Sequence, residues 1–71
     1  MLGGVLDVRV NGTAAQLTAG ATVADVVGRW CPSPDGIAVA RNGDVVPRSA
    51  WEQTALETGD RLEIVTAAAG G

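Results

Sequence analysis

The groups of this sequence that are best placed to do chemistry lie at its C-terminal end, Gly70-Gly71. Glycine has no side chain to block access to the α-carboxylate, and its backbone adopts angles that other residues avoid, so such an end can thread a narrow channel. If this end is functional, the reactive atoms are therefore backbone atoms of Gly71, with Gly70 as its sterically permissive neighbour. Ala67, Ala68 and Ala69 are small enough to follow into a partner's active site, although an alanine-rich composition explains them equally well. A frayed terminus or a cloning scar is the alternative that the di-glycine alone leaves open.

The side chains offer no catalytic pair. The sequence has no histidine, so the commonest general base near neutral pH is missing. A single cysteine, Cys31, excludes a Cys/His nucleophile pair, a tetrahedral zinc site and an internal disulfide. A sulfur-relay role for Cys31 is less favoured than simple packing after the predicted helix. We therefore expect a protein that is not itself an enzyme and that binds no metal or cofactor.

Composition favours one small folded domain that works with protein partners. The chain has 71 residues, of which 46% are hydrophobic, and this suits a single domain with an aliphatic core. Its net charge of −3 argues against nucleic-acid binding, which needs a basic face. All the basic residues are arginine, so no lysine can accept a conjugated protein. Without a targeting leader or an apolar run of membrane-spanning length, we expect the cytoplasm and no membrane partner.

The first half of the sequence predicts a β-hairpin followed by a helix. Residues 5–18 alternate apolar and polar side chains on either side of Asn11-Gly12, the strongest short hairpin signal. Thr22 stands three residues before Asp25, the spacing of a capping box, so a helix of about two turns should begin there and end at the prolines that follow. One apolar stripe follows the helical period in this segment: Val23, Val26, Val27 and Trp30.

The second half predicts three more strands and a short second helix. The apolar run 37–40 lacks polar alternation, which is typical of a strand covered on both sides. An Asn-Gly turn at 42–43 leads to a brief strand at 45–46. Residues 49–52 have capping-box spacing and predict a short helical turn. The last strand places Leu62, Ile64 and, more loosely, Val65 on one face, with Arg61 and Glu63 on the other.

These elements together predict an α+β fold. We expect a mixed sheet of four to five strands with one helix packed across it and a short second helix. The first and last strands can lie parallel only if a crossover connects them, and residues 11–60 supply one. Residues 1–66 should form the domain, and residues 67–71 should form a flexible C-terminal tail that ends in Gly-Gly.

Several short stretches share the order and spacing of one known family. They are Val10-Asn11-Gly12, Ala21-Thr22-Val23, residues 36–42, Val46-Pro47-Arg48 with Trp51, residues 59–65, and Gly70-Gly71. Taken together, they resemble the ubiquitin-like β-grasp superfamily and, more narrowly, the ThiS-type sulfur carrier proteins of thiamine thiazole biosynthesis. The stretches cover nearly the whole chain, and two segments depart from the pattern: residues 31–35, and Gly3-Gly4, which slightly extends the usual N-terminus.

The resemblance implies a function for the C-terminal carboxylate. In that family the terminal glycine, here Gly71, is adenylated and then converted to a thiocarboxylate, which donates sulfur for the thiazole ring. The implied partners are an E1-like adenylyltransferase of the ThiF type that uses ATP, a sulfur donor such as a cysteine desulfurase, and a thiazole synthase of the ThiG type. The alternatives are the small subunit of molybdopterin synthase (MoaD-like), a carrier for another sulfur metabolite and, less favoured, a ubiquitin-like protein modifier.

Four further side chains have both a structural and a functional interpretation. Trp51 is more often core than partner surface in an aliphatic domain of this size. Arg48 could contact an acidic partner groove, or it could simply be solvated. Asp60 and Glu63 could steer docking onto a basic enzyme face, although turn chemistry explains Asp60 equally well.

Overall fold

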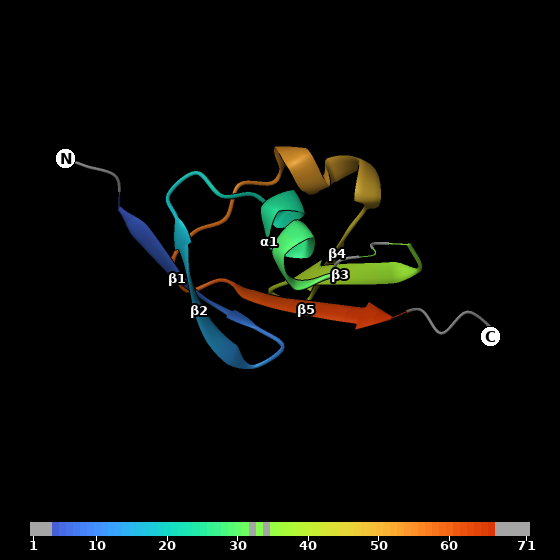
Figure 1. The fold of residues 1–71 in the computed structure, drawn as a ribbon, viewed down its shortest axis with the longest axis horizontal. Helices are drawn as coiled ribbons and strands as arrows, with labels where there is room; N and C mark the ends of the chain where they lie inside the picture. Colours follow the sequence, from blue (N-terminus) through green and yellow to red (C-terminus); the bar gives the residue numbers. More distant parts are fainter. Residues whose placement is uncertain (1–3, 32, 34, 67–71) are drawn as a thin grey trace.

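The computed structural model describes residues 4–31, 33 and 35–66. Five strands and two helices follow one another in the predicted order (Figure 1). They are β1 (Val5–Val10), β2 (Thr13–Thr18), α1 (Val23–Trp30), β3 (Ile37–Arg41), β4 (Asp44–Val46), the 3-10 helix η1 (Arg48–Gln53) and β5 (Arg61–Thr66).

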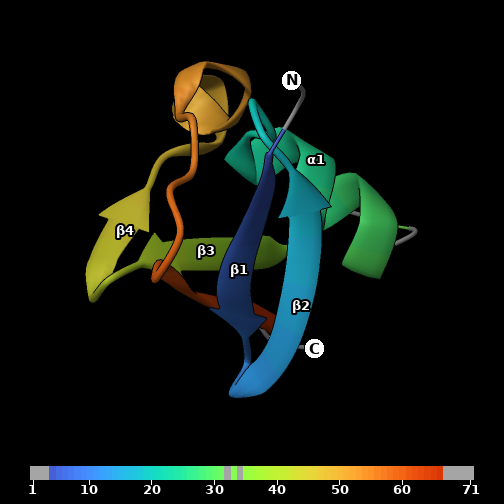
Figure 2. The same ribbon diagram turned by 90° about the vertical axis from the view of Figure 1, so that its left-hand side faces the viewer.

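The strands form one mixed sheet with the order β2-β1-β5-β3-β4. β1 and β5 run parallel, an arrangement that the crossover over residues 11–60 makes possible, and the other neighbouring pairs are antiparallel. The chain between them crosses over through α1, which lies on one face of the sheet (Figure 1). Figure 2 shows the strands β1 and β2 side by side at one end of the sheet, with β3 and β4 farther from the viewer. The predicted α+β class and the five-stranded mixed sheet are confirmed.

The predicted hairpin at residues 5–18 is also confirmed, and its turn explains its register. Asn11 and Gly12 both have positive φ, at 51° and 82°. Two central residues of this kind give a turn whose twist matches that of the flanking strands. Each residue of β1 therefore pairs with one of β2, from Val5 opposite Thr18 to Val10 opposite Thr13.

Helix α1 begins with the predicted capping box. The Thr22 hydroxyl accepts the Asp25 N–H at 3.3 Å, and the Asp25 carboxylate accepts the Thr22 N–H at 2.8 Å. The valines of the stripe are buried, but Trp30 is 37% exposed, because the helix ends there and the ring projects beyond the core. In the described part of the chain, no helix is long and apolar enough to cross a membrane.

The prediction that residues 37–40 form a strand covered on both sides is wrong, because β3 is covered on one face only. Val39 is 1% exposed and lies in the core beneath α1. Ala38 and Ala40 point to the opposite face and are half-buried. The unbroken apolar run reflects small alanines on the outer face of the sheet rather than a second covering layer.

The short second helix lies where it was predicted, but it begins at Arg48 rather than at residue 49. η1 begins directly after Pro47, and no side chain caps it, so the capping-box spacing at residues 49–52 is coincidental. Trp51 holds this helix on the core, where it is 6% exposed. Its indole N–H donates a hydrogen bond of 2.9 Å to the Val46 carbonyl, which satisfies the ring's polar group.

The core is aliphatic apart from one tryptophan. Its buried members come from every strand, from both helices and from the loop before β5: Val8, Val10, Leu17, Val23, Val26, Val27, Val39, Val46, Trp51, Leu56 and Leu62. In β5 the inner face carries Leu62 and Ile64, whereas Val65 is 56% exposed on the outer face. The loosely assigned Val65 therefore shares its face with Arg61 and Glu63.

Candidate functional site

β5 is the strand that leads to the predicted functional end. It lies in the middle of the sheet, between β1 and β3, and ends at Thr66. In Figure 1 its arrow passes below α1 and ends beyond the helix. The predicted site residues follow directly and lie outside the described residues, so their roles stay predictions: Gly71, Gly70, Ala69, Ala68 and Ala67.

Both edges of β5 are hydrogen-bonded to neighbouring strands. On one edge, β3 pairs antiparallel with it up to Ile37 opposite Thr66. On the other edge, β1 pairs parallel with it, and the Asn11 N–H donates to the Leu62 carbonyl at 2.8 Å. The chain that approaches the predicted site therefore leaves the domain from a fixed central strand.

The start of β5 is fixed by a cluster around Asp60. This carboxylate is 6% exposed and accepts three hydrogen bonds. Arg41 Nε donates at 2.9 Å, Asn42 Nδ2 at 3.0 Å and the Glu57 backbone N–H at 2.8 Å. The arrangement joins β3, the turn after it and the loop before β5 through one buried charge.

The electrostatics of Asp60 follow from opposing effects. Burial raises the pKa of the carboxyl group because it disfavours the charged form. The hydrogen bonds from Asn42, Glu57 and Arg41, together with the charge of Arg41, outweigh burial and hold the Asp60 pKa below its ordinary value of 3.8. The carboxylate is therefore ionised at neutral pH and serves as a structural anchor.

This geometry corrects the prediction that Asp60 steers docking, because a buried and fully paired carboxylate offers no surface charge. Glu63 is exposed on the outer face of the sheet, so a docking role for it stays a prediction. The sequence signalled a turn at Gly59-Asp60, and Gly59 does have a positive φ of 94°. No local pattern signalled that Arg41 and Asn42 would meet this carboxylate, because they lie 19 and 18 residues from Asp60 in the sequence.

An apolar strip covers the outer face of the sheet beside the end of β5. Val65 is 56% exposed and lies opposite Ala38 in the β3–β5 pairing. Ala40 lies further along β3, between the exposed Glu63 of β5 and Val45 of β4, which is 73% exposed. We call these four apolar residues the outer strip. It adjoins the point at which the chain leaves the sheet for the predicted tail.

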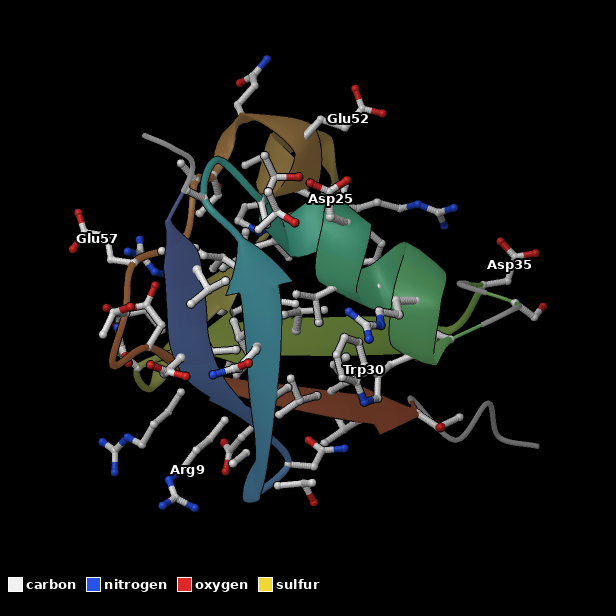
Figure 3. All side chains as sticks on the ribbon, turned by 60° about the vertical axis from the view of Figure 1, so that its left-hand side comes forward. Arg9, Asp25, Trp30, Asp35, Glu52 and Glu57 are labelled. Atoms are coloured by element: carbon white, nitrogen blue, oxygen red, sulfur yellow. The ribbon has the colours of Figure 1, made fainter. Side chains whose placement is uncertain are left out.

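The other side chains singled out in the sequence lie elsewhere. Cys31 is a half-buried free thiol after α1. Arg48 is exposed, lies 5.6 Å from the centre of the Trp51 ring and forms an ion pair of 3.5 Å with Asp35. Figure 3 shows Trp30 at the end of α1 and Arg9 on the side of the sheet that faces away from the helix. The Arg48 partners Trp51 and Asp35 therefore lie in η1 and in the loop before β3 rather than in β5.

The described residues offer no candidate metal site. Among residues 4–31, 33 and 35–66, no group of three or more His, Cys, Asp or Glu side chains could hold a metal ion. What the fold does provide is a fixed strand, an apolar surface beside its end and a short chain of small residues after it. This arrangement suits the presentation of a backbone group to another protein.

Comparison with known proteins identifies relatives over nearly the whole chain. The ThiS family model matches residues 8–71. The sulfur carrier protein ThiS of Escherichia coli is 32% identical over 66 residues, which cover 93% of this chain and 100% of that protein.

A second relative is much longer. A thiazole synthase of Paramagnetospirillum magneticum is 37% identical over 62 residues, or 87% of this chain. This chain spans 19% of the length of that synthase, so the similarity concerns one segment of it.

The fold has a solved counterpart. The crystal structure of ThiS from Geobacter metallireducens matches with a TM-score of 0.80 and covers 93% of this chain and 100% of its own. The two sequences are 23% identical, so this similarity concerns the fold, and it confirms the predicted β-grasp architecture.

Proposed function

The chain belongs to the ThiS family, and from this membership we propose that it is a sulfur carrier for thiamine biosynthesis whose cargo is held on the carboxyl group of Gly71. The observation that carries the proposal is the extent of the match. The family model reaches residue 71, and the bacterial sulfur carrier protein aligns over its full length. The relation therefore includes the C-terminal segment on which the chemistry depends.

The proposed chemistry activates a poor electrophile. A carboxylate carries negative charge and lacks a good leaving group, so the Gly71 carboxylate attacks the α-phosphate of ATP and forms an acyl-adenylate with release of pyrophosphate. A persulfide from a sulfur donor then attacks the carbonyl carbon and displaces AMP. Reduction of the resulting acyl disulfide by a thiol cleaves the sulfur–sulfur bond and leaves a thiocarboxylate. Sulfur thus travels bound to protein without release of free sulfide.

In this scheme the catalytic groups belong to the partners. The sequence has no histidine, and its one thiol, Cys31, is a half-buried residue directly after α1. We propose an adenylyltransferase of the ThiF type as the ATP-using partner and a cysteine desulfurase as the sulfur donor. Because these reactions use ATP and a reduced sulfur relay, we place them in the cytoplasm.

We propose a thiazole synthase as the acceptor of the sulfur. A thiazole synthase that contains a segment similar to this chain supports this assignment. When two proteins are joined in one polypeptide, each meets the other at a high effective concentration, which favours partners that act in sequence. The same match disfavours the small subunit of molybdopterin synthase as an alternative.

The outer strip is the surface on which we expect the adenylyltransferase to dock. Val65 stands six residues before Gly71, so a fully extended chain spans at most about 20 Å between them. An active site that holds Gly71 therefore lies within reach of Val65, and the enzyme around it must cover this end of the sheet. The exposed Val45 and Val65 side chains would give that contact an apolar centre.

Mass spectrometry of the intact protein tests the proposal. The purified chain is incubated with a ThiF-type adenylyltransferase, ATP, a cysteine desulfurase and cysteine. We expect an acyl-adenylate first and then a product in which one terminal oxygen is replaced by sulfur. A variant that lacks Gly71 is the control and should show neither product, although it retains the whole described fold.

Two results would overturn the proposal. One is an unmodified wild-type chain under conditions in which the adenylyltransferase activates its own cognate carrier. The other is the appearance of the chain in covalent adducts with larger proteins, which would indicate a protein modifier. Transfer of the sulfur to a thiazole synthase, measured as thiazole formation, tests the acceptor separately.

A further inference from the structure

Two asparagines that form the tight turns of the sheet also hold β5. Asn11 and Asn42 each precede a glycine, and each has a positive φ, at 51° and 52°. Asn42 binds the start of β5, where its Oδ1 accepts the Arg61 N–H at 2.9 Å and its Nδ2 donates to Asp60. Asn11 binds further along, at Ile64. The two side chains therefore fix opposite parts of the strand that leads to Gly71.

The Asn11 carboxamide makes hydrogen bonds to β5 that the backbone of a longer β1 would otherwise make. Along the parallel pair, the Arg9 N–H donates to the Asp60 carbonyl and the Asn11 N–H donates to the Leu62 carbonyl. The next partner in this series is Ile64, but the backbone turns away from β5 at Asn11. The side chain continues the ladder instead, because Oδ1 accepts the Ile64 N–H at 2.8 Å and Nδ2 donates to the Ile64 carbonyl at 3.2 Å.

This contact extends the two-sided support of β5 almost to its end. Backbone pairing between β1 and β5 extends to Leu62, and the Asn11 side chain adds a hydrogen bond on the same edge of β5 at Ile64. The other edge is paired with β3 as far as Thr66. Ile64 is thus the last residue whose N–H and carbonyl are both held on the β1 side, and Gly71 follows seven residues later.

We propose that Asn11 is a positioning residue for the reaction at Gly71. It fixes the place and direction from which the terminal segment leaves the sheet, so that the activating enzyme receives it in one geometry. The inference rests on the proposed function as a sulfur carrier. Without the carboxamide, the end of β5 would be held by β3 alone, and the enzyme would have to order additional backbone when it binds.

The chemistry of the contact requires a carboxamide at this position. Ile64 presents one donor and one acceptor, and only a side chain with both an acceptor and a donor in one plane matches them. Aspartate would keep the acceptor but would place a second oxygen against the Ile64 carbonyl. Glycine would keep the turn, since it adopts positive φ without strain, and would remove both hydrogen bonds.

The test compares Asn11→Gly with the matched variant Asn42→Gly. Both substitutions keep an allowed turn and remove a carboxamide bound to β5, but only the first removes the support at Ile64. Adenylation is measured as pyrophosphate release at increasing carrier concentration, below the unfolding temperature of both variants. Hydrogen exchange of the Ile64 N–H is measured by NMR in the free proteins.

For Asn11→Gly we expect KM for the carrier to rise about ten-fold with kcat nearly unchanged, which corresponds to the cost of ordering roughly one more residue of backbone on binding. The Ile64 N–H should exchange faster, whereas the Val39 N–H in the core should not. Asn42→Gly should lower the unfolding temperature at least as much, yet leave KM near the wild-type value. Asn11→Asp, which keeps the turn and one hydrogen bond, should give an intermediate KM.

The inference is overturned if Asn11→Gly leaves KM unchanged, or if Asn42→Gly raises it equally, because Asn11 would then only stabilise the fold. If Asn11→Gly does not fold, Asn11→Asp decides by the same criterion. Failure of the proposed function is a different result, since wild-type protein would then not be adenylated at all.

Discussion

Replacement of Asp60 by asparagine removes the one buried charge among the described residues without changing the shape of the side chain. The carboxylate accepts three hydrogen bonds, from Arg41, Asn42 and the Glu57 N–H. Hydrogen bonds to charged groups contribute about 1.5–3 kcal/mol each, but an asparagine oxygen retains some of them and the partly exposed Arg41 regains water. We therefore expect Asp60→Asn to lower the free energy of unfolding by about 3 kcal/mol near neutral pH.

That loss is large for a domain of this size. Stabilities of about 0.05–0.15 kcal/mol per residue give this chain of 71 residues roughly 4–11 kcal/mol in total. A loss of about 3 kcal/mol should lower the midpoint of thermal unfolding by roughly 12–24 °C. The variant should still fold at room temperature, so the comparison can be made.

The pH dependence gives the sharper test. The pKa of Asp60 is lower in the folded protein than its ordinary value of 3.8, so folding favours the ionised carboxylate. Its contribution to stability is complete above the unfolded-state pKa and is lost as the pH falls through the lower folded-state value. The difference in stability between wild type and Asp60→Asn should therefore be constant around neutral pH and shrink in acid.

Urea unfolding followed by the fluorescence of the buried Trp51 measures this difference at each pH. Asp35→Asn is the control, because this carboxylate is 88% exposed and its 3.5 Å ion pair with Arg48 lies on the surface, where such pairs contribute little. The reasoning is refuted if Asp60→Asn loses no more stability than Asp35→Asn, or if its deficit persists unchanged in acid.

Four further substitutions test other parts of the structure. Thr22→Ala removes the capping box of α1 and should cost about 1 kcal/mol of stability in urea unfolding. Trp51→Ala leaves a cavity beside η1 and should cost about 3–5 kcal/mol, measured by thermal unfolding followed by circular dichroism. Cys31→Ser should leave sulfur loading unchanged in the intact-mass assay, which excludes a relay through this thiol. Val65→Asp should raise KM for adenylation, whereas Val5→Asp, equally exposed on the outer face of β1 but far from the end of β5, should not.

Local patterns in the sequence predicted most of the fold. The hairpin, α1 and the turn at residues 42–43 each depend on residues close together in the chain, so alternation, a capping box and Asn-Gly signals were sufficient. Connection rules established only that a crossover of this length allows β1 and β5 to run parallel, and the structure shows that they do. The prediction failed where a local pattern had two explanations. The apolar run of β3 could indicate either a second covering layer or small residues on the outer face, and the structure shows small, half-buried alanines there.

The contacts that shape the site could not be predicted in this way. Asp60 meets Arg41 and Asn42 only when β3 and β5 pair, so its burial depends on the three-dimensional fold. The same holds for the contact between Asn11 and Ile64, which are 53 residues apart in sequence. Asn-Gly is a strong turn signal, and the turn alone accounts for the asparagine. No sequence pattern therefore indicated that the Asn11 side chain also binds Ile64.

β5 must meet two requirements that conflict in most strands, since it holds the centre of the sheet together and also delivers the chain to another protein. The structure separates them along the strand. Charge and hydrogen bonds at Asp60 secure its start, and the Asn11 carboxamide supports its later part. Variants at the two positions should therefore differ in kind: Asp60→Asn should reduce the folded fraction while the folded molecules keep their KM for adenylation, and Asn11→Gly should raise KM in molecules that remain folded. If the two variants changed KM equally at a temperature at which both are folded, stability and presentation would be a single property of β5, and the proposed separation along the strand would be wrong.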